Sequence, residues 1–356
     1  MINDNKYIQR CFDLARYGLG NTSPNPSVGA VIVDLKNRII GEGWTNPFGG
    51  AHAEVNAVAS VKPEDKPLLK SSTIYVSLEP CFHFGKTPPC VDLILKHKIP
   101  HVVMAYSDPF PKVSGKSIEK LKQNGVEVTL LPPLYYSSKH ATLQPFFTNI
   151  SSKRPYIILK WAETSDGYIG KADESIPISN IYAKRLVHKW RSEADAIMVG
   201  TNTVALDNPE LTNRLYFGKS PIRVVLDRRR RLQNNLNIFD NSVKTLIYTE
   251  GDDFDESANI GVHYRRVTFD TNLIPNVLDD LRSQNIGIVF VEGGAQLLHS
   301  FIEKGLWDEA RVFKSSAINI REGGVLAPKI PYICLERKLQ LFDNQYLFLE
   351  TLNIGG

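Results

Sequence analysis

The chain has 356 residues, of which 42% are hydrophobic and 22% are charged, which is typical of a globular protein and excludes a fibrous or largely disordered one. Its 42 Lys and Arg against 38 Asp and Glu give a formal charge of +4, too small an excess to favour nucleic acid over a phosphorylated small molecule. The length exceeds one typical domain, so we expect two. No apolar stretch reaches membrane-spanning length and residues 1–6 lack the apolar core of a signal peptide, so the sequence predicts a cytoplasmic protein.

The first part of the chain alternates between strand and helix periodicity. Strands are predicted at residues 28–33, 39–40, 73–78, 101–105 and 126–130, and helices at 7–19, 52–61, 89–98 and 117–124. Strands that alternate with helices predict a layered α/β domain. A loose segment follows, with Pro132-Pro133 and residues 151–153, so we place a boundary near residue 150 and assign the first domain to residues 1–149.

Residues 150–356 form a second predicted α/β domain. Its strands are predicted at residues 156–161, 196–199, 222–226, 245–248 and 286–291, and its helices at 181–191, 273–284 and 295–304. A strand runs into the glycine pair Gly293-Gly294 and then into a helix, so amides at that helix start could hold a phosphate. The spacing is not G-x-G-x-x-G, and a plain tight turn explains the glycines equally well.

Two short segments of the first domain carry the residue types of a zinc site. His52 and Glu54 open a predicted helix, and Cys81 and Cys90 enclose a loop of eight residues. One imidazole and two thiolates make a three-ligand zinc site with an open fourth position. Glu54 is not needed as a ligand, so it is the candidate general acid/base. Zinc deaminases that act on bases carry the related pattern H-x-E…P-C-x-x-C, with a shorter cysteine spacing.

The sequence leaves open a closed four-ligand zinc site, and it also predicts the state of the four cysteines. His83 could complete a closed structural zinc site, although such a site has no use for Glu54. In a reducing compartment Cys81 and Cys90 are predicted to be metal ligands rather than a disulfide. Cys11 lies in a helical pattern and Cys334 in an apolar run, and both are interpreted as buried structural thiols.

The segments around these residues resemble one enzyme family. In the first domain they are residues 22–33, 51–57, 78–81, 86–90 and 108–109, and in the second they are 159–162, 165–167, 196–200, 203–209, 211–214 and 291–294. They resemble the bifunctional deaminase/reductases of riboflavin biosynthesis, which share the longer cysteine spacing. The resemblance implies an α/β fold in both halves: a cytidine-deaminase-like three-layer domain, then a dihydrofolate-reductase-like domain.

The resemblance also implies roles for single residues. In the deaminase domain Asn25 would bind the pyrimidine edge, His83 and Lys86 would line the phosphate side, and Glu54 would move protons. The NADPH contacts that it implies are Ala162, Thr203, Asp207, Gly294, Ala295 and Gln296. The substrate contacts that it implies in the reductase domain are Lys160, Ser175, Arg191, Leu211, Arg214 and Glu292. Without the resemblance, Asn25 would be a turn residue, and His83, Lys86 and Arg191 would be solvated surface residues.

The chain departs from the family pattern at four positions. Phe82 stands where the family has a small residue and Phe84 where it often has histidine, which would reshape the rim of the deaminase pocket. Pro177 replaces an aromatic residue that is expected to stack against the cofactor. The loss of this aromatic side chain would weaken NADPH binding. Arg228 replaces a small hydroxyl residue and would attract the 2′-phosphate, although the run 228–231 is otherwise interpreted as a solvated turn.

The sequence therefore predicts a bifunctional enzyme that requires zinc and NADPH. It would deaminate 2,5-diamino-6-(5-phosphoribosylamino)pyrimidin-4-one by hydrolysis and then reduce the ribosyl chain to ribityl. Three alternatives stay open: a deaminase with a cofactor-defective reductase domain, a zinc deaminase acting on nucleic-acid bases, and a non-catalytic zinc scaffold. The expected partner is a small pyrimidine ribosyl phosphate, with no nucleic acid and no membrane, and the family tendency predicts a homo-oligomer.

Overall fold

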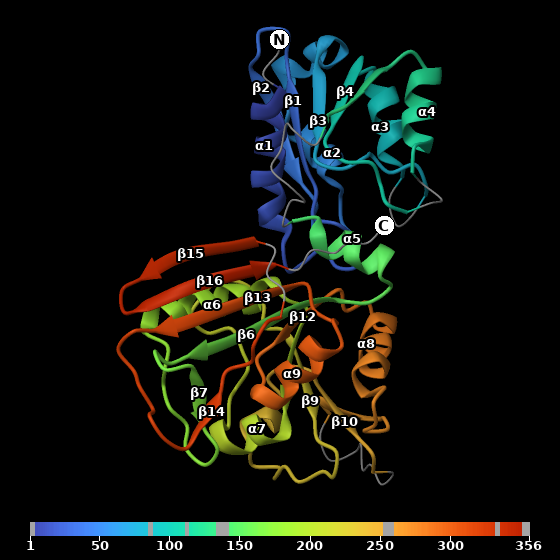
Figure 1. Cartoon of the computed structure of the whole chain (residues 1–356). Helices are drawn as coiled ribbons and strands as arrows, with labels where there is room; N and C mark the ends of the chain where they lie inside the picture. The colour runs from blue at the N-terminus through green and yellow to red at the C-terminus, as the bar shows by residue number, and fades with distance from the viewer. Residues whose placement is uncertain are drawn as a thin grey trace. The chain divides into compact units, whose positions relative to one another are not determined.

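The computed structural model describes residues 4–84, 88–110, 114–132, 142–251, 260–331 and 335–350. The chain divides into two units, Met1–Lys153 and Arg154–Gly356, and both are layered α/β folds (Figure 1). No helix in the described part of the chain combines the length and apolar character needed to cross a bilayer.

The first unit is built on one five-stranded sheet with the order β2-β1-β3-β4-β5. Its strands are β1 (Gly29–Val33), β2 (Ile39–Trp44), β3 (Thr73–Val76), β4 (His101–Met104) and β5 (Glu127–Leu130). β1 pairs antiparallel with β2 and β3, whereas β3, β4 and β5 are parallel. The helices are α1 (Asp4–Ala15), α2 (Ala53–Ser60), α3 (Cys90–His97), α4 (Lys116–Gln123) and α5 (Gln144–Ser151), with 3-10 turns at Arg16–Gly18 and Pro63–Ser71.

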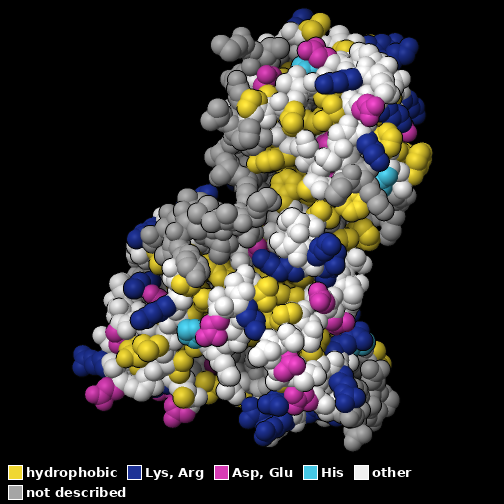
Figure 2. Space-filling model, turned by 45° about the vertical axis from the view of Figure 1, so that its right-hand side comes forward, with side chains coloured by type: hydrophobic (Ala, Val, Ile, Leu, Met, Phe, Trp, Pro, Cys, Tyr) yellow, Lys and Arg dark blue, Asp and Glu magenta, His cyan; other side chains and the backbone are white. Residues whose placement is uncertain are grey.

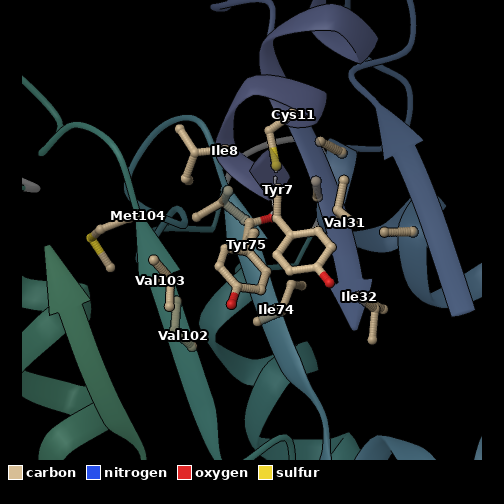
Figure 3. Packing of buried hydrophobic residues seen from close by; sticks show 14 of the residues in the cluster. Tyr7, Ile8, Cys11, Val31, Ile32, Ile74, Tyr75, Val102, Val103 and Met104 are labelled. Atoms are coloured by element: carbon tan, nitrogen blue, oxygen red, sulfur yellow. Dashed lines mark hydrogen bonds between the residues drawn. The ribbon is translucent and has the colours of Figure 1, made fainter. Parts of the chain in front are cut away.

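The helix α1 covers one face of this sheet through an apolar core. Figure 3 shows Tyr7, Ile8 and Cys11 of α1 above residues of β1 and β3, and all three side chains are buried. The Tyr75 hydroxyl donates a hydrogen bond to the Asp4 carboxylate at 2.7 Å, which ties the start of the helix to β3. Cys11 is thus buried, as its place in a helical pattern predicted, whereas Cys334 lies outside the described residues.

The helix α2 lies directly on β2, on the sheet face opposite α1. The approach is close because β2 carries glycine at the two contact positions, Gly41 and Gly43. A Cβ at Gly43 would lie 2.5 Å from the carbonyl oxygen of Ala53 and would also meet the backbone nitrogen of Ala57. Because His52 and Glu54 belong to the start of α2, these glycines set where both functional side chains lie.

We expect Gly43→Ala to destabilise the first unit by about 1–3 kcal/mol, because the added methyl group meets backbone atoms that cannot move alone. Displacement of α2 should also weaken zinc retention. Thermal unfolding and bound-zinc analysis would measure the two effects. Gly251→Ala is the matched control, since its nearest neighbours would be at 3.6 Å, an ordinary contact. Equal melting temperatures for the two variants would contradict the prediction.

The second unit contains a nine-stranded sheet with the order β11-β10-β9-β8-β12-β6-β13-β16-β15. Its strands are β6 (Tyr156–Glu163), β8 (Ala196–Gly200), β9 (Ile222–Leu226), β10 (Thr245–Thr249), β11 (Val262–Arg266), β12 (Ile288–Val291), β13 (Glu309–Ser315), β15 (Leu335–Leu341) and β16 (Asn344–Glu350). The strands from β11 to β13 in this order are parallel, and β16 and β15 add an antiparallel hairpin. β7 (Tyr168–Lys171) and β14 (Gly324–Leu326) pair separately.

Helices cover both faces of this sheet. α6 (Ile181–Glu193) and α7 (Thr201–Asp207) contribute to one core cluster, while α8 (Leu273–Ser283) and α9 (Ala295–Glu303) contribute to the other. The carboxyl ends of β8, β9 and β12 lie together at one edge, which is where parallel α/β sheets bind ligands.

Candidate active sites

The predicted zinc ligands come together in the first unit, each at the end of an element. His52 directly precedes α2, Cys90 begins α3, and Cys81 lies in the loop after β3. The His52 Nδ1 atom is 3.4 Å from the sulfur of Cys81 and 3.4 Å from that of Cys90. The Cys90 backbone N–H donates to the Cys81 sulfur at 3.2 Å. Three elements distant in sequence thus place one imidazole and two sulfurs within 4.8 Å of one another.

The chemistry of these donors fits zinc. Hydrogen bonds from the Cys90 thiol and from His52 lower the pKa of Cys81, which favours the thiolate form that zinc binds. The cluster that the described residues form consists of His52, Cys81 and Cys90 and does not include His83, which is exposed. The closed four-ligand alternative is therefore not the arrangement in the structure, and a fourth position is left for water.

Glu54 lies beside the cluster in the first turn of α2 and is only 4% exposed. Burial raises the pKa of its carboxyl to about 7, and the Cys81 sulfur adds to the effect. Glu54 lines the same cavity as His52 and Cys81, of about 420 Å³. The buried carboxyl and two of the three predicted zinc ligands thus face one cavity.

Other predicted deaminase residues also reach this cavity. Asn25 and His83 line it, whereas Lys86 lies outside the described residues. Phe82 and Phe84 are not among its described lining residues: Phe84 is exposed, and Phe82 carries the Lys120 ammonium over its ring at 5.4 Å. The lining that sequence reasoning missed includes Phe48, Glu79, Asp108, Phe110, Phe146 and Ile150.

Glu79 is the buried charge in this set, and it organises one wall of the cavity. Its carboxylate accepts hydrogen bonds from the backbone N–H groups of Asp108 and Gly115, at 3.1 and 3.0 Å, and from the Ser117 hydroxyl. It therefore anchors the segment that presents Asp108 to the cavity. In the sequence, Glu79 could have been found as a charged residue that directly precedes Pro80-Cys81 and follows a buried strand.

In the second unit, the structure gathers three predicted substrate residues into a buried charge cluster. Arg191 of α6 donates two hydrogen bonds to the Glu292 carboxylate, at 2.7 and 3.0 Å, and the Lys160 ammonium of β6 lies 3.7 Å from it. Burial alone would raise the pKa of Glu292, but Arg191 and Lys160 outweigh it, so the pKa is lowered. Glu292 is thus an anion held between two cations.

The predicted cofactor residues line a second cavity, of about 690 Å³, at the carboxyl edge of the sheet. The predicted residues along it are Thr203, Asp207, Gly294, Ala295 and Gln296, together with Ser175, which the resemblance implied for substrate. The Gly294 N–H donates to the Thr203 hydroxyl at 3.1 Å, which joins the start of α9 to α7. Glu292 precedes the Gly293-Gly294 turn, so the charge cluster and this cavity adjoin along the chain.

The remaining predicted reductase residues lie around the charge cluster. Ala162 packs against the core cluster that contains α6. Leu211 is buried with a positive φ of 55°, and the Arg214 side chain pairs with Glu210 at 2.7 Å. The Arg191 guanidinium also donates to the Thr212 carbonyl at 3.0 Å, so it holds the segment between Leu211 and Arg214.

His188 fixes the same segment and should make it sensitive to pH. Its Nδ1 atom accepts the Arg214 backbone N–H at 2.9 Å. Burial, with Arg191 and Arg214 nearby, lowers the pKa of His188 from 6.5 to about 4. Because the folded pKa is depressed, the neutral imidazole stabilises the fold above pH 6.5, and this contribution is lost as the pH falls toward 4.

We therefore expect the second unit of the wild-type protein to lose stability between pH 6.5 and 4 more steeply than that of His188→Gln, which cannot titrate. Urea unfolding followed at several pH values would measure the two slopes. Parallel curves for wild type and variant would contradict a role for His188.

Comparison with known proteins covers both units. Residues 1–106 match the cytidine and deoxycytidylate deaminase zinc-binding region, and residues 155–318 match the RibD C-terminal domain. The chain is 36% identical over 315 residues to the riboflavin biosynthesis protein RibD of Aquifex aeolicus, covering 87% of this chain and 86% of that protein. It is 37% identical over 331 residues to that of Bacillus amyloliquefaciens, covering 91% and 86%. The chain belongs to the RibD family.

Solved structures agree with this assignment to the RibD family. Acinetobacter baumannii RibD matches with a TM-score of 0.85 and 31% identity, over 98% of both chains. A diaminohydroxyphosphoribosylaminopyrimidine deaminase/5-amino-6-(5-phosphoribosylamino)uracil reductase from Thermotoga maritima matches with a TM-score of 0.83 and 31% identity, again over 98% of both. The fold predicted for this chain, a cytidine-deaminase-like domain followed by a reductase domain, is confirmed.

Proposed function

We propose that this protein is a bifunctional RibD enzyme that deaminates 2,5-diamino-6-(5-phosphoribosylamino)pyrimidin-4-one and then reduces the ribosyl chain of the product to ribityl. The observation that carries the proposal is the cavity lined by the buried Glu54 together with His52 and Cys81, which form one cluster with Cys90. Family membership along nearly the whole chain supports the second activity.

In the deaminase unit, His52, Cys81 and Cys90 would hold zinc, which supplies Lewis-acid activation of water when bound. Glu54 would take a proton from the water and return it to the amine, which leaves as ammonia. Asn25 would orient the pyrimidine from across the same cavity, and His83 with Lys86 would lie toward the phosphate. The apolar side chains of Phe48, Phe110 and Phe146 would limit water around the ring.

In the reductase unit, NADPH supplies the hydride when bound. Thr203, Asp207 and the Gly294–Gln296 turn would bind the cofactor in the larger cavity. Lys160, Arg191 and Glu292 would bind and orient the ribosyl phosphate, because three fixed charges in a buried cluster hold a polar substrate without reorganising. Leu211 and Arg214 would close the substrate side, and Ser175 and Ala162 would complete the two subsites.

A paired assay tests both activities on the zinc-loaded full-length protein. Ammonia release from the diaminopyrimidine ribosyl phosphate is followed first, and NADPH oxidation is followed after NADPH is added. Ammonia followed by NADPH oxidation supports the proposal. Ammonia without oxidation would establish the deaminase with a defective reductase, the alternative that Pro177 motivates. No ammonia with zinc bound would overturn the substrate assignment.

The face of the molecule drawn in Figure 2 gives no support to the nucleic-acid alternative. On the face shown in Figure 2, Lys and Arg side chains are scattered among Asp and Glu rather than gathered into a continuous basic surface. The proposed partner is thus a small pyrimidine ribosyl phosphate. A cytoplasmic location and a homo-oligomer belong to the same proposal, and light scattering on the purified protein would measure the oligomeric state.

A further inference from the structure

The two chain segments that carry the predicted cysteine ligands are joined to each other by backbone contacts. The Cys90 N–H donates to the Cys81 sulfur at 3.2 Å, and the Val91 N–H donates to the Cys81 carbonyl at 3.3 Å. We call residues 79–82 and 89–92 the cysteine arms. Their separation decides how far apart the two sulfurs lie, so the contacts that hold both arms bear on zinc binding.

The helix α4 holds the first cysteine arm on the side before Cys81. The Glu79 carboxylate, two residues before Cys81, accepts hydrogen bonds from the Gly115 N–H at 3.0 Å and from the Ser117 hydroxyl. Both donors lie at the start of α4, which is fixed to the core of the first unit by the fully buried Leu121. The first arm is therefore attached to a helix that is itself packed into the core.

One side chain of α4, Lys120, contacts both cysteine arms. Its Nζ atom lies 5.4 Å from the centroid of the Phe82 ring and 2.6 Å from the Asp92 carboxylate. Phe82 directly follows Cys81. Asp92 lies in the first turn of α3, which begins at Cys90. α3 and α4 lie side by side (Figure 1), which brings the lysine within reach of both arms.

Phe82 takes part in this bridge at a position where the chain departs from the family pattern. The family has a small residue there, and a small side chain has no aromatic face to attract an ammonium group. The described lining of the deaminase cavity does not include Phe82, and its half-buried ring lies beneath Lys120 instead. In the described part of the chain, the departure therefore acts on a cysteine arm.

Each contact of Lys120 is modest by itself, since the Lys120 and Asp92 side chains are 35% and 39% exposed. Both contacts use one ammonium group, so the lysine side chain is ordered only once for two interactions. Loss of both contacts together should change a rate or an equilibrium constant about three- to tenfold. An effect of this size can be measured on zinc release.

We propose that Lys120 is a positioning residue of the zinc site: it bridges Phe82 and Asp92 and so keeps the two cysteine sulfurs at the separation that a tetrahedral metal requires. This inference rests on the zinc ligands proposed above. Without the bridge the arms separate more readily, so bound zinc should be released faster. Lys120 is not among the described residues that line the cavity, so turnover with zinc bound should stay at the wild-type level.

Zinc release from the zinc-loaded full-length protein into a chromophoric chelator tests the bridge. Lys120→Gln should release zinc about three- to tenfold faster than the wild type. Lys120→Arg should stay within about twofold of the wild-type rate, because a guanidinium group can make both contacts. Lys122→Gln removes an exposed cation from the same helix and is the matched control, with no change expected. Thermal melting shows whether each variant is folded.

Two variants at the ends of the bridge sharpen the test. Phe82→Leu and Asp92→Asn each remove one contact and should accelerate zinc release less than Lys120→Gln does. Either change added to Lys120→Gln should have little further effect, because the contact that it removes is already lost. Unchanged zinc release in Lys120→Gln, or an acceleration that Lys120→Arg or Lys122→Gln shares, would overturn the bridge and leave the proposed deaminase intact. A wild-type protein that binds no zinc would overturn the proposed ligands as well.

Discussion

Glu54→Gln should reduce ammonia release by about 10²–10⁴-fold, the range that a general acid/base contributes. The amide keeps the size of the carboxyl but can neither accept the proton from water nor return it to the leaving amine. Glu54 is buried beside three metal-ligand side chains and is not one of them, so the substitution should leave zinc bound. Ammonia release and bound zinc are measured on the same preparation.

The reductase unit of the same chain is the internal control for this experiment. Supplied with the deaminated pyrimidine, Glu54→Gln should oxidise NADPH at the wild-type rate, because the cofactor cavity is lined by residues of the second unit. Glu64→Gln, at an exposed position, is the matched surface control. Ammonia release within tenfold of wild type, with zinc bound, would remove Glu54 from the mechanism.

The deaminase site could be predicted from the sequence because its chemistry is local. His52 and Glu54 share one helix turn, and both cysteines lie at element ends that prolines and apolar runs mark. The sequence did not reveal the rest of the cavity lining. Asp108 and Phe146 reach the cavity from segments far along the chain, and Glu79 holds Asp108 through backbone N–H groups.

The fold of the second unit was harder to predict because some of its strands contain several charged residues and so lack a clear apolar pattern. β13 has the sequence Glu309-Ala-Arg-Val-Phe-Lys-Ser, and charges such as Glu309 and Arg311 are typical of a surface segment. In the structure the two charges pair with each other, and Arg311 stacks over Trp190 at 4.7 Å, so a strand inside the sheet carries buried charge. β15, with Glu336, Arg337, Lys338 and Gln340, was missed for the same reason, whereas β16 was missed although its residues 346–349 are apolar or aromatic.

The helices α5 and α7 and the paired strands β7 and β14 were also missed. α7 has seven residues, too few for a clear helical period, and β7 and β14 have four and three. α7 nevertheless carries Thr203 and Asp207, whose place on the cofactor cavity came only from the family resemblance. The sequence also gives no sign that Arg223, a charged residue of β9, is fully buried and donates to Asp240 at 2.6 Å.

Arg191→Met should destabilise the second unit by about 3–5 kcal/mol, because it leaves the Glu292 charge buried without its bidentate partner. Both side chains are nearly enclosed, at 12% and 10% exposure, so water cannot replace the lost hydrogen bonds. NADPH oxidation should be lost as well, whereas ammonia release by the first unit should persist. Calorimetric melting, with both activities assayed on the same protein, measures the effect.

A charge-matched control and a double variant separate stability from function. Lys189→Met, two residues earlier on α6, removes an exposed cation paired with Glu193 at 3.7 Å and should cost at most about 1 kcal/mol. Arg191→Met combined with Glu292→Met should regain part of the lost stability, because no unpaired carboxylate remains and Lys160 can give up its proton. NADPH oxidation should stay absent in the double variant. If oxidation returned together with stability, the Arg191–Glu292 pair would be structural support for the reductase unit and not a part of its substrate site.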